Sequence, residues 1–188
     1  LRDLYNEEEE HWGGISFGLG VRTALYVRDV DFSSLETQRN IEAAGADVLA
    51  MKSINEEAGL ASWHAEFSRW AFQNRGSLTV LPAAAFEEVP GGVARQGCQA
   101  GLPAGVTECT SHFLTGATFG AAVQHFLQLP QFGRFEDDVV FRGDGSVQSA
   151  RLRAQHVDTF GSEGQVDALE EAEGLTDRWQ GALPGCFV

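Results

Sequence analysis

The spacing of apolar residues predicts one strand and two helices in the first half of the chain. Residues 22–30, RTALYVRDV, are apolar on both faces, as in a central strand. Ser33-x-x-Glu36 then forms a capping box for a helix. Apolar residues recur on one face of that helix: Ile41, Ala44, Val48 and Met51. Gly59 interrupts the pattern, and Ser62 can cap a second, shorter helix.

Aromatic residues line the second helix. Trp63, Phe67 and Trp70 share one face and are followed by Phe72. Aromatics at this spacing are typical of a buried core rather than of a cofactor site. Residues 74–110 are rich in proline and glycine, and they predict a long irregular loop. A loop of that length in a compact domain is typical of a functional or interaction segment.

A third helix is predicted from about residue 111 to 128, with Phe119, Val123 and Phe126 on one face. Gly116 and Gly120 weaken its first half, because glycine loses more backbone entropy than other residues on entering a helix. The prediction is therefore a helix whose second half is the more stable.

A β-hairpin is predicted to follow this helix. Pro130 cannot continue the helix, because its ring removes a backbone donor and clashes with the preceding turn. Residues 138–142 then form a strand, and Gly143 and Gly145 supply the positive φ angles of a short turn. In the next strand, apolar and polar side chains alternate between the two faces. The inward face carries Ala150, Leu152 and Ala154, and the outward face carries Arg151, Arg153 and Gln155.

The last predicted element is a helix opened by Ser162-x-x-Gln165 and ending near Trp179. Its inward residues are expected to be Val166, Leu169 and Ala172. Residues 1–14 predict a short helix or arm. Together these elements predict a single α+β domain over residues 1–188, with a mainly antiparallel sheet and helices packed on one face.

Charge and hydropathy restrict the partners. The 27 acidic and 13 basic residues give a net charge of -14. This balance disfavours nucleic acid and an anionic membrane surface, both of which attract cationic side chains. No stretch approaches the roughly 20 apolar residues of a membrane-spanning helix, and the acidic start lacks the order of a signal peptide. Both ends are expected to be cut from something longer.

Three cysteines leave the redox state open. Cys98 and Cys109 flank a glycine- and proline-rich loop and could form a disulfide in an oxidising compartment. The other interpretation is two buried or free thiols. Cys186 would then be left over, either buried or paired elsewhere.

Asp29 and Asp31 are one candidate for chemistry. Two carboxylates directly after an apolar strand could hold Mg²⁺ or Mn²⁺ against a diphosphate, as in nucleotide-sugar transferases. Acidic residues at a strand-to-helix junction also serve as turn and capping groups.

Other motifs do not favour catalysis. Residues 136–138 are a second acidic cluster, with Asp144 in the nearby turn, but the spacing is not that of a Ca²⁺ loop. We interpret Asp137, Asp138 and Asp144 as turn and rim residues. The histidines form no metal-binding motif: His11, His64, His112, His125 and His156. We therefore expect no enzyme, no cofactor and no metal site.

The order of these motifs resembles one family of membrane proteins. The matching stretches are LYNEEEEHWGG, VRDVDFSS, SWHAEFSRW, HFLQLPQFGRFEDDVVFRGDGSVQSARLR and the helix end DRW. Within them the matching positions are Asp31-Phe32-Ser33, Ser62-Trp63, Phe126-Leu127, Pro130-Gln131-Phe132, Phe135 and Asp144 to Arg151. The chain resembles the second porter-type ectodomain of the Patched, Dispatched and Niemann–Pick type C branch of the resistance–nodulation–division superfamily. The resemblance covers most of the chain outside the 74–110 loop.

That resemblance implies a ferredoxin-like porter subdomain between two transmembrane helices of a larger transporter. The whole protein would sit in the plasma membrane or an internal membrane, with this segment extracellular or lumenal. It would move sterols, lipids or lipid-modified ligands through a hydrophobic conduit. Its partners would be a sister ectodomain, the membrane helices and the cargo, and a homo-oligomer is an option. Family members often carry several disulfides here, whereas this sequence offers at most one.

Two alternatives belong to other classes of function. The first is an ectodomain that acts as a protein-binding or oligomerisation module through residues 74–110, without transport. The second is a metal-dependent transferase that uses Asp29 and Asp31.

Overall fold

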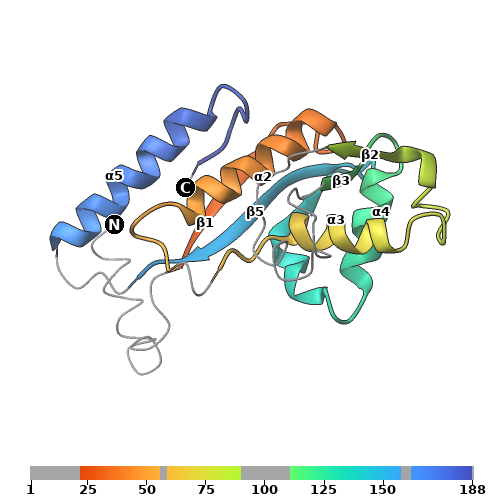
Figure 1. Cartoon of the computed structure of the whole chain (residues 1–188), viewed down its shortest axis with the longest axis horizontal. Helices are drawn as coiled ribbons and strands as arrows, with labels where there is room; N and C mark the ends of the chain where they lie inside the picture. Colours follow the sequence, from red (N-terminus) through yellow and green to blue (C-terminus); the bar gives the residue numbers. More distant parts are fainter. Residues whose placement is uncertain (1–21, 56–58, 90–110, 158–161, 188) are drawn as a thin grey trace, which may run out of the picture.

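The α+β class is confirmed. The computed structural model describes residues 22–55, 59–89, 111–157 and 162–187, and these form two small antiparallel sheets with helices around them. Figure 1 shows the C-terminal helix at one end of the molecule and the helices from the middle of the chain at the other, with the longest strand between them. The arm predicted over residues 1–14 lies outside the described residues.

The larger sheet contains three strands in the order β1-β5-β4: β1 (Arg22–Arg28), β5 (Val147–Gln155) and β4 (Val139–Phe141). Both neighbouring pairs are antiparallel, and β1 pairs with β5 over its whole length. The predicted alternation is confirmed, since the three apolar side chains expected to face inward from β5 are all buried. The central strand is therefore the second arm of the predicted hairpin.

Isolated bridges extend this sheet on both sides. Beyond β4, the edge of β5 continues with Ala61 opposite Arg153. On the far edge of β1, Tyr26 and Phe187 exchange two backbone hydrogen bonds of 2.8 and 3.1 Å. The C-terminal segment therefore lies against β1, on the side away from β5.

The first helix, α2 (Leu35–Leu49), begins one residue later than the capping box predicts. The Ser34 hydroxyl accepts a hydrogen bond from the Thr37 backbone N–H at 3.1 Å and caps the helix. Ser33 instead donates to Asp31. The two adjacent serines look alike in sequence, and the turn that closes β1 decides which of them is the cap.

The second helix, α3 (Trp63–Gln73), follows the prediction. The Ser62 hydroxyl accepts from the Ala65 backbone N–H at 3.1 Å. Trp63, Phe67 and Trp70 are all buried, which confirms the core interpretation.

The helix predicted from residue 111 is wrong in its first part. Ser111–Leu114 forms strand β3, which pairs antiparallel with β2 (Phe86–Val89) after a short turn η2 (Ala83–Ala85). Helix α4 (Phe119–Gln128) begins only after Gly116, whose φ of 79° is incompatible with a right-handed helix. The prediction of one irregular loop over residues 74–110 is therefore wrong for residues 86–89, which form β2. Residues 90–110 of that loop lie outside the described part of the chain.

The hairpin is confirmed in its strands and corrected in its turn. The elbow after α4 is a 3₁₀ segment, η3 (Gly133–Asp138). The backbone N–H of Arg142 donates to the Ser146 carbonyl at 2.8 Å and closes the turn. Gly145 has a φ of 84°, whereas Gly143 is not among the glycines with positive φ. One left-handed residue is enough for this turn.

The last helix, α5 (Ser162–Trp179), has the predicted bounds. Of its three predicted inward residues, only Ala172 packs against the core, where it is partly buried. Val166 and Leu169 are 52% and 60% exposed, whereas Leu175 is buried. The reason is that α5 is held through residues nearer its C-terminal end, where Trp179 Nε1 donates to Asp47 on α2 at 3.0 Å. Its first apolar positions extend beyond that contact.

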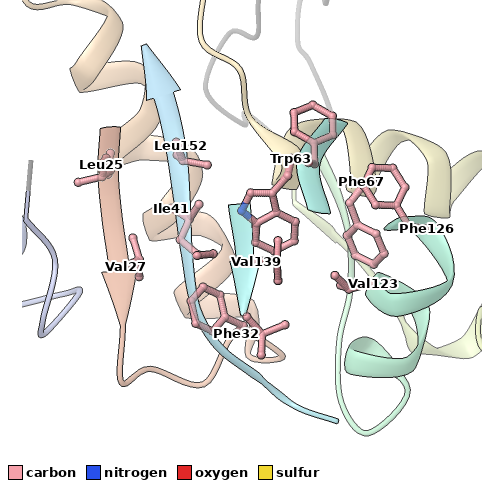
Figure 2. Close-up of a cluster of buried hydrophobic side chains, with 14 of the residues drawn as sticks. Leu25, Val27, Phe32, Ile41, Trp63, Phe67, Val123, Phe126, Val139 and Leu152 are labelled. Carbon is pink, nitrogen blue, oxygen red and sulfur yellow. The ribbon is translucent and has the colours of Figure 1, made fainter. Parts of the chain in front are cut away.

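The core has two connected parts, which Figure 2 shows side by side. Leu25 and Leu152 from the sheet meet Ile41 of α2 in one part. Phe67 of α3 meets Phe126 of α4 in the other, with ring centroids 5.6 Å apart in an edge-to-face arrangement. Such pairs add about 0.5–1.5 kcal/mol beyond their buried area.

Candidate functional site

One cavity of the described residues opens where three turns meet. It has a volume of about 650 Å³ and is lined by residues 29–33 after β1, residues 116–121 at the start of α4, and residues 142–147 of the hairpin turn. The structure therefore brings Asp29 and Asp31 to the same cavity as Asp144, a juxtaposition that sequence reasoning did not predict.

Asp31 holds its own turn. Its Oδ1 accepts hydrogen bonds from the Ser33 backbone N–H at 2.9 Å and from the Ser33 hydroxyl at 2.7 Å. This local arrangement is common for an aspartate that is followed two residues later by a hydroxyl side chain. One oxygen of the carboxylate is therefore committed to the fold.

Asp144 repeats this arrangement in the hairpin turn. Its Oδ1 accepts from the Ser146 backbone N–H at 2.9 Å and from the Ser146 hydroxyl at 2.7 Å. These two hydrogen bonds, the hydroxyl first, lower the pKa of Asp144 below its ordinary value. The interpretation of Asp144 as a turn residue agrees with this geometry.

Asp29 is the third carboxylate of the cavity and occupies an unusual backbone conformation. Its φ is 58°, in the left-handed region that aspartate enters more readily than most residues. Its side chain is mostly exposed, and Oδ2 lies 3.7 Å from Nε of Arg28. This conformation turns the chain out of β1 and toward the cap of α2.

The start of α4 touches the hairpin turn at Gly120. A Cβ atom at this position would lie within contact distance of three backbone atoms, and far too close to the Gly145 carbonyl oxygen. Gln124 Nε2 donates to that same oxygen at 3.4 Å. Because Gly120 has no side chain, the start of α4 can pack directly against the hairpin turn at the wall of the cavity.

This cavity does not form a metal centre from the residues described. No group of three or more histidine, cysteine, aspartate or glutamate side chains in that part of the chain is placed to hold a metal ion. Asp31 and Asp144 accept hydrogen bonds from the serines of their own turns, and Asp29 lies beside Arg28. The transferase hypothesis therefore draws no support from the geometry of this cavity.

The interpretation of Asp138 as a rim residue is wrong. Asp138 is only 2% exposed. Its Oδ1 accepts from Arg151 Nε at 2.8 Å, and its Oδ2 accepts from Arg153 Nε at 3.0 Å and Nη2 at 2.9 Å. The pKa of Arg151 is raised, first by its hydrogen bond to Asp138 and then by Tyr26.

Part of this cluster could be predicted from the alternation of apolar and polar residues in β5, which places both arginines on the side of the sheet opposite the core. What sequence reasoning missed was their common partner. Asp138 ends η3 just before β4, and β4 pairs with β5, so the pairing carries the carboxylate across to the arginine side of the sheet.

The other predicted chemistry-bearing residues lie apart in the fold. His64 is buried, and its Nε2 lies 3.3 Å from Oε1 of Gln38. His112 stacks on Phe72 with ring centroids 3.6 Å apart. Cys186 is a buried free thiol, which agrees with one of the two alternatives given for it from the sequence. Burial raises the pKa of this thiol.

Cys98 and Cys109, which the sequence allows either as a disulfide or as two thiols, lie outside the described residues, as does His11. Comparison with protein-family models finds no match, and no curated protein matches the chain. In the described part of the chain, no helix is both long enough and apolar enough to cross a membrane.

Proposed function

We propose that this chain is an extracellular or lumenal domain of a multi-spanning transporter of the resistance–nodulation–division superfamily, in its Patched, Dispatched and Niemann–Pick type C branch. In this role it forms part of a hydrophobic conduit for sterols, lipids or lipid-modified ligands. The observation that carries the proposal is the order of strands in the larger sheet.

That order supports a ferredoxin-like subdomain. The hairpin inserts β5 between β1 and β4, and the segment at Phe187 joins the opposite edge of β1. Read across the sheet, the order is Phe187, β1, β5, β4. The ferredoxin-like fold builds strand, helix, hairpin, helix and strand in this order, and the bridge at Phe187 stands where its last strand would lie.

The direction of the backbone at Phe187 also supports an ectodomain. Because Phe187 pairs antiparallel with Tyr26, the chain there runs toward the beginning of β1. At Arg22 and at Phe187 the described chain therefore faces the same end of the sheet. A domain inserted between two membrane helices needs this geometry, since both connections lead to one membrane surface.

A conduit wall requires apolar side chains on an accessible face. Tyr26, Val140 and Phe187 are 37%, 51% and 42% exposed, and all three come from the larger sheet or its edge. Tyr26 and Phe187 stack with ring centroids 4.7 Å apart and nearly parallel planes. These residues are our proposed contribution to the conduit.

The test uses the intact protein and begins with its gene. We expect membrane-spanning segments on both sides of this domain, and a gene without them would refute the proposal. Purified in detergent, the intact protein should be labelled by a photoreactive sterol or lipid, and an excess of unlabelled sterol or lipid should compete. A Val140→Trp variant should change both labelling and transport.

A matched control separates the conduit from a general surface effect. Val166 on α5 is as exposed as Val140, at 52% against 51%. Val166→Trp should therefore leave labelling and transport unchanged. Equal effects of both variants, or transport with no labelling of this domain, would contradict a conduit role.

A further inference from the structure

The outward side of α5 forms a second surface of interest. The inward side of this helix is fixed by contacts, since Glu171 Oε2 accepts from the Ser53 hydroxyl at 2.7 Å and Leu175 is buried. Successive residues of an α-helix are turned by about 100°, so these contacts place the opposite side in solvent. We define the outward face by the exposed residues on that side: Val166, Leu169, Glu170, Glu173 and Asp177. Figure 1 shows α5 at one end of the molecule, away from α3 and α4.

Two large apolar side chains lie together on the outward face. Val166 and Leu169 are 52% and 60% exposed, and they are the most exposed of the large apolar residues in the described part of the chain. Residues three apart on a helix are neighbours on its surface, so the two side chains form one apolar spot. Adjacent exposed apolar groups on a helix are typical of a face that packs on a partner.

Carboxylates surround this apolar spot. Glu170, Glu173 and Asp177 are exposed on the same side of α5, and Asp167 is exposed at its edge. None of these four has an ion pair within the described residues, because Arg178, the one basic residue of α5, pairs with Asp47 of α2 at 2.9 Å. The outward face therefore carries negative charges that no basic side chain of the described part neutralises.

We propose that the outward face of α5 binds a basic amphipathic helix of a partner protein. Apolar side chains of that helix cover Val166 and Leu169, and its flanking lysines or arginines pair with the carboxylates around them. Two helices pack along each other through such an apolar stripe, and the charges beside the stripe select the partner. This binding does not depend on the proposed transport function, and it uses none of the residues assigned to the conduit.

Charge selects this occupant among the possible ones. A second copy of the domain would bring the same carboxylates together, and its net charge of -14 opposes self-association. Nucleic acid and anionic membranes are repelled by the same net charge. An uncharged apolar segment would remove water from the carboxylates without supplying a partner for them. A basic helix is attracted both by the carboxylates of the face and by the domain as a whole.

The probe is a fluorescein-labelled peptide of about 14 residues, with leucine at every third or fourth position and lysine between. One matched peptide replaces leucine by serine, and the other replaces lysine by glutamate. Binding to the whole 188-residue chain is followed by fluorescence anisotropy at low and high salt. We expect saturable binding of the leucine–lysine peptide, weakened by salt, and at least about tenfold weaker binding of each matched peptide.

Two charge reversals separate the outward face from the charge of the whole domain. Glu173→Lys and Glu136→Lys change the net charge equally, but Glu136 is exposed on η3, which packs against α4, β4 and β5. We expect Glu173→Lys to weaken binding by about three- to tenfold and Glu136→Lys to weaken it by less than about twofold.

A third variant tests the apolar spot. Leu169→Gln removes an apolar side chain but keeps a similar helix propensity, and it should weaken binding by about three- to tenfold. Because these three positions are exposed, the far-ultraviolet circular dichroism of each variant should equal that of the parent chain.

Four results would overturn the inference. One is the absence of saturable binding of the leucine–lysine peptide to the folded chain. Another is equal weakening by Glu173→Lys and Glu136→Lys, because binding would then follow net charge alone. The third is self-association in sedimentation experiments that Leu169→Gln abolishes, which would make a second copy the occupant. The fourth is a cross-link from a photoreactive amino acid in place of Leu169 to another segment of the same chain, which would make that segment the occupant.

Discussion

Substitution of Gly120 by alanine tests whether the start of α4 really packs against the hairpin turn. The added Cβ would lie well under 3.0 Å from the Gly145 carbonyl oxygen, 3.2 Å from the Gly145 carbonyl carbon and 3.4 Å from Cα of Ser146. All three are backbone atoms, so none can rotate aside as a flexible side chain would. The helix and the turn must therefore move apart.

Two opposing effects set the expected magnitude. Overpacking of this kind costs about 1–3 kcal/mol. Alanine regains at most about 1 kcal/mol of helix propensity over glycine, and less in the first turn. Since the clash is with backbone, we expect Gly120→Ala to lower the free energy of unfolding by about 1–2 kcal/mol. In a domain of this size that corresponds to a loss of about 2–8 °C in Tm.

The assay is urea unfolding followed by circular dichroism, with Gly174→Ala as the matched control. Gly174 lies inside α5, and a Cβ added there would meet no neighbouring atom within 4 Å. Alanine at this position should therefore stabilise the domain by about 0.5–1 kcal/mol. A Gly120→Ala variant as stable as the parent protein, alongside the expected gain for Gly174→Ala, would refute the packing of α4 on the turn.

Three further substitutions test other contacts. Asp138→Ala leaves its two arginine partners side by side, and we expect a loss of about 2–4 kcal/mol in chemical unfolding, against little change for the exposed neighbour Asp137→Ala. Asp47→Ala removes the acceptor of Trp179 Nε1, so hydrogen exchange should rise along α5 while α4 stays protected; uniform protection would contradict this. Burial raises the pKa of Glu171, but hydrogen bonds from Ser53 and Lys52 outweigh it, and the net pKa is lowered. Its contribution to stability is therefore present above pH about 4.3 and is lost as the pH falls through the lowered pKa. Glu171→Gln should remove that part of the pH dependence, and an unchanged profile of stability against pH would count against the contact.

Local patterns predicted most elements because their causes are local. The cap at Ser62, the aromatic face of α3 and the alternation of β5 all depend on residues within one or two turns or pleats of each other. The bounds of α5 follow from the same kind of signal.

The errors arose where a distant segment decides the outcome. Ser111–Leu114 became a strand because Phe86–Val89 pairs with it, and nothing within the segment announces that partner. Val166 and Leu169 have helical spacing, yet they are exposed because α5 is anchored through later residues. Likewise, Asp138 is adjacent to exposed acidic residues in sequence but is buried by the arginines of β5.

The sequence by itself therefore determined the α+β class, the strands of the hairpin and most helix positions, since hydrophobic periodicity and capping are properties of neighbouring residues. Only the tertiary structure decided the strand order, the cavity where three turns meet and the arginine pair on a buried carboxylate. Each of these depends on the packing of the whole chain rather than on any local pattern, because the segments that meet are brought together by strand pairing and by the core.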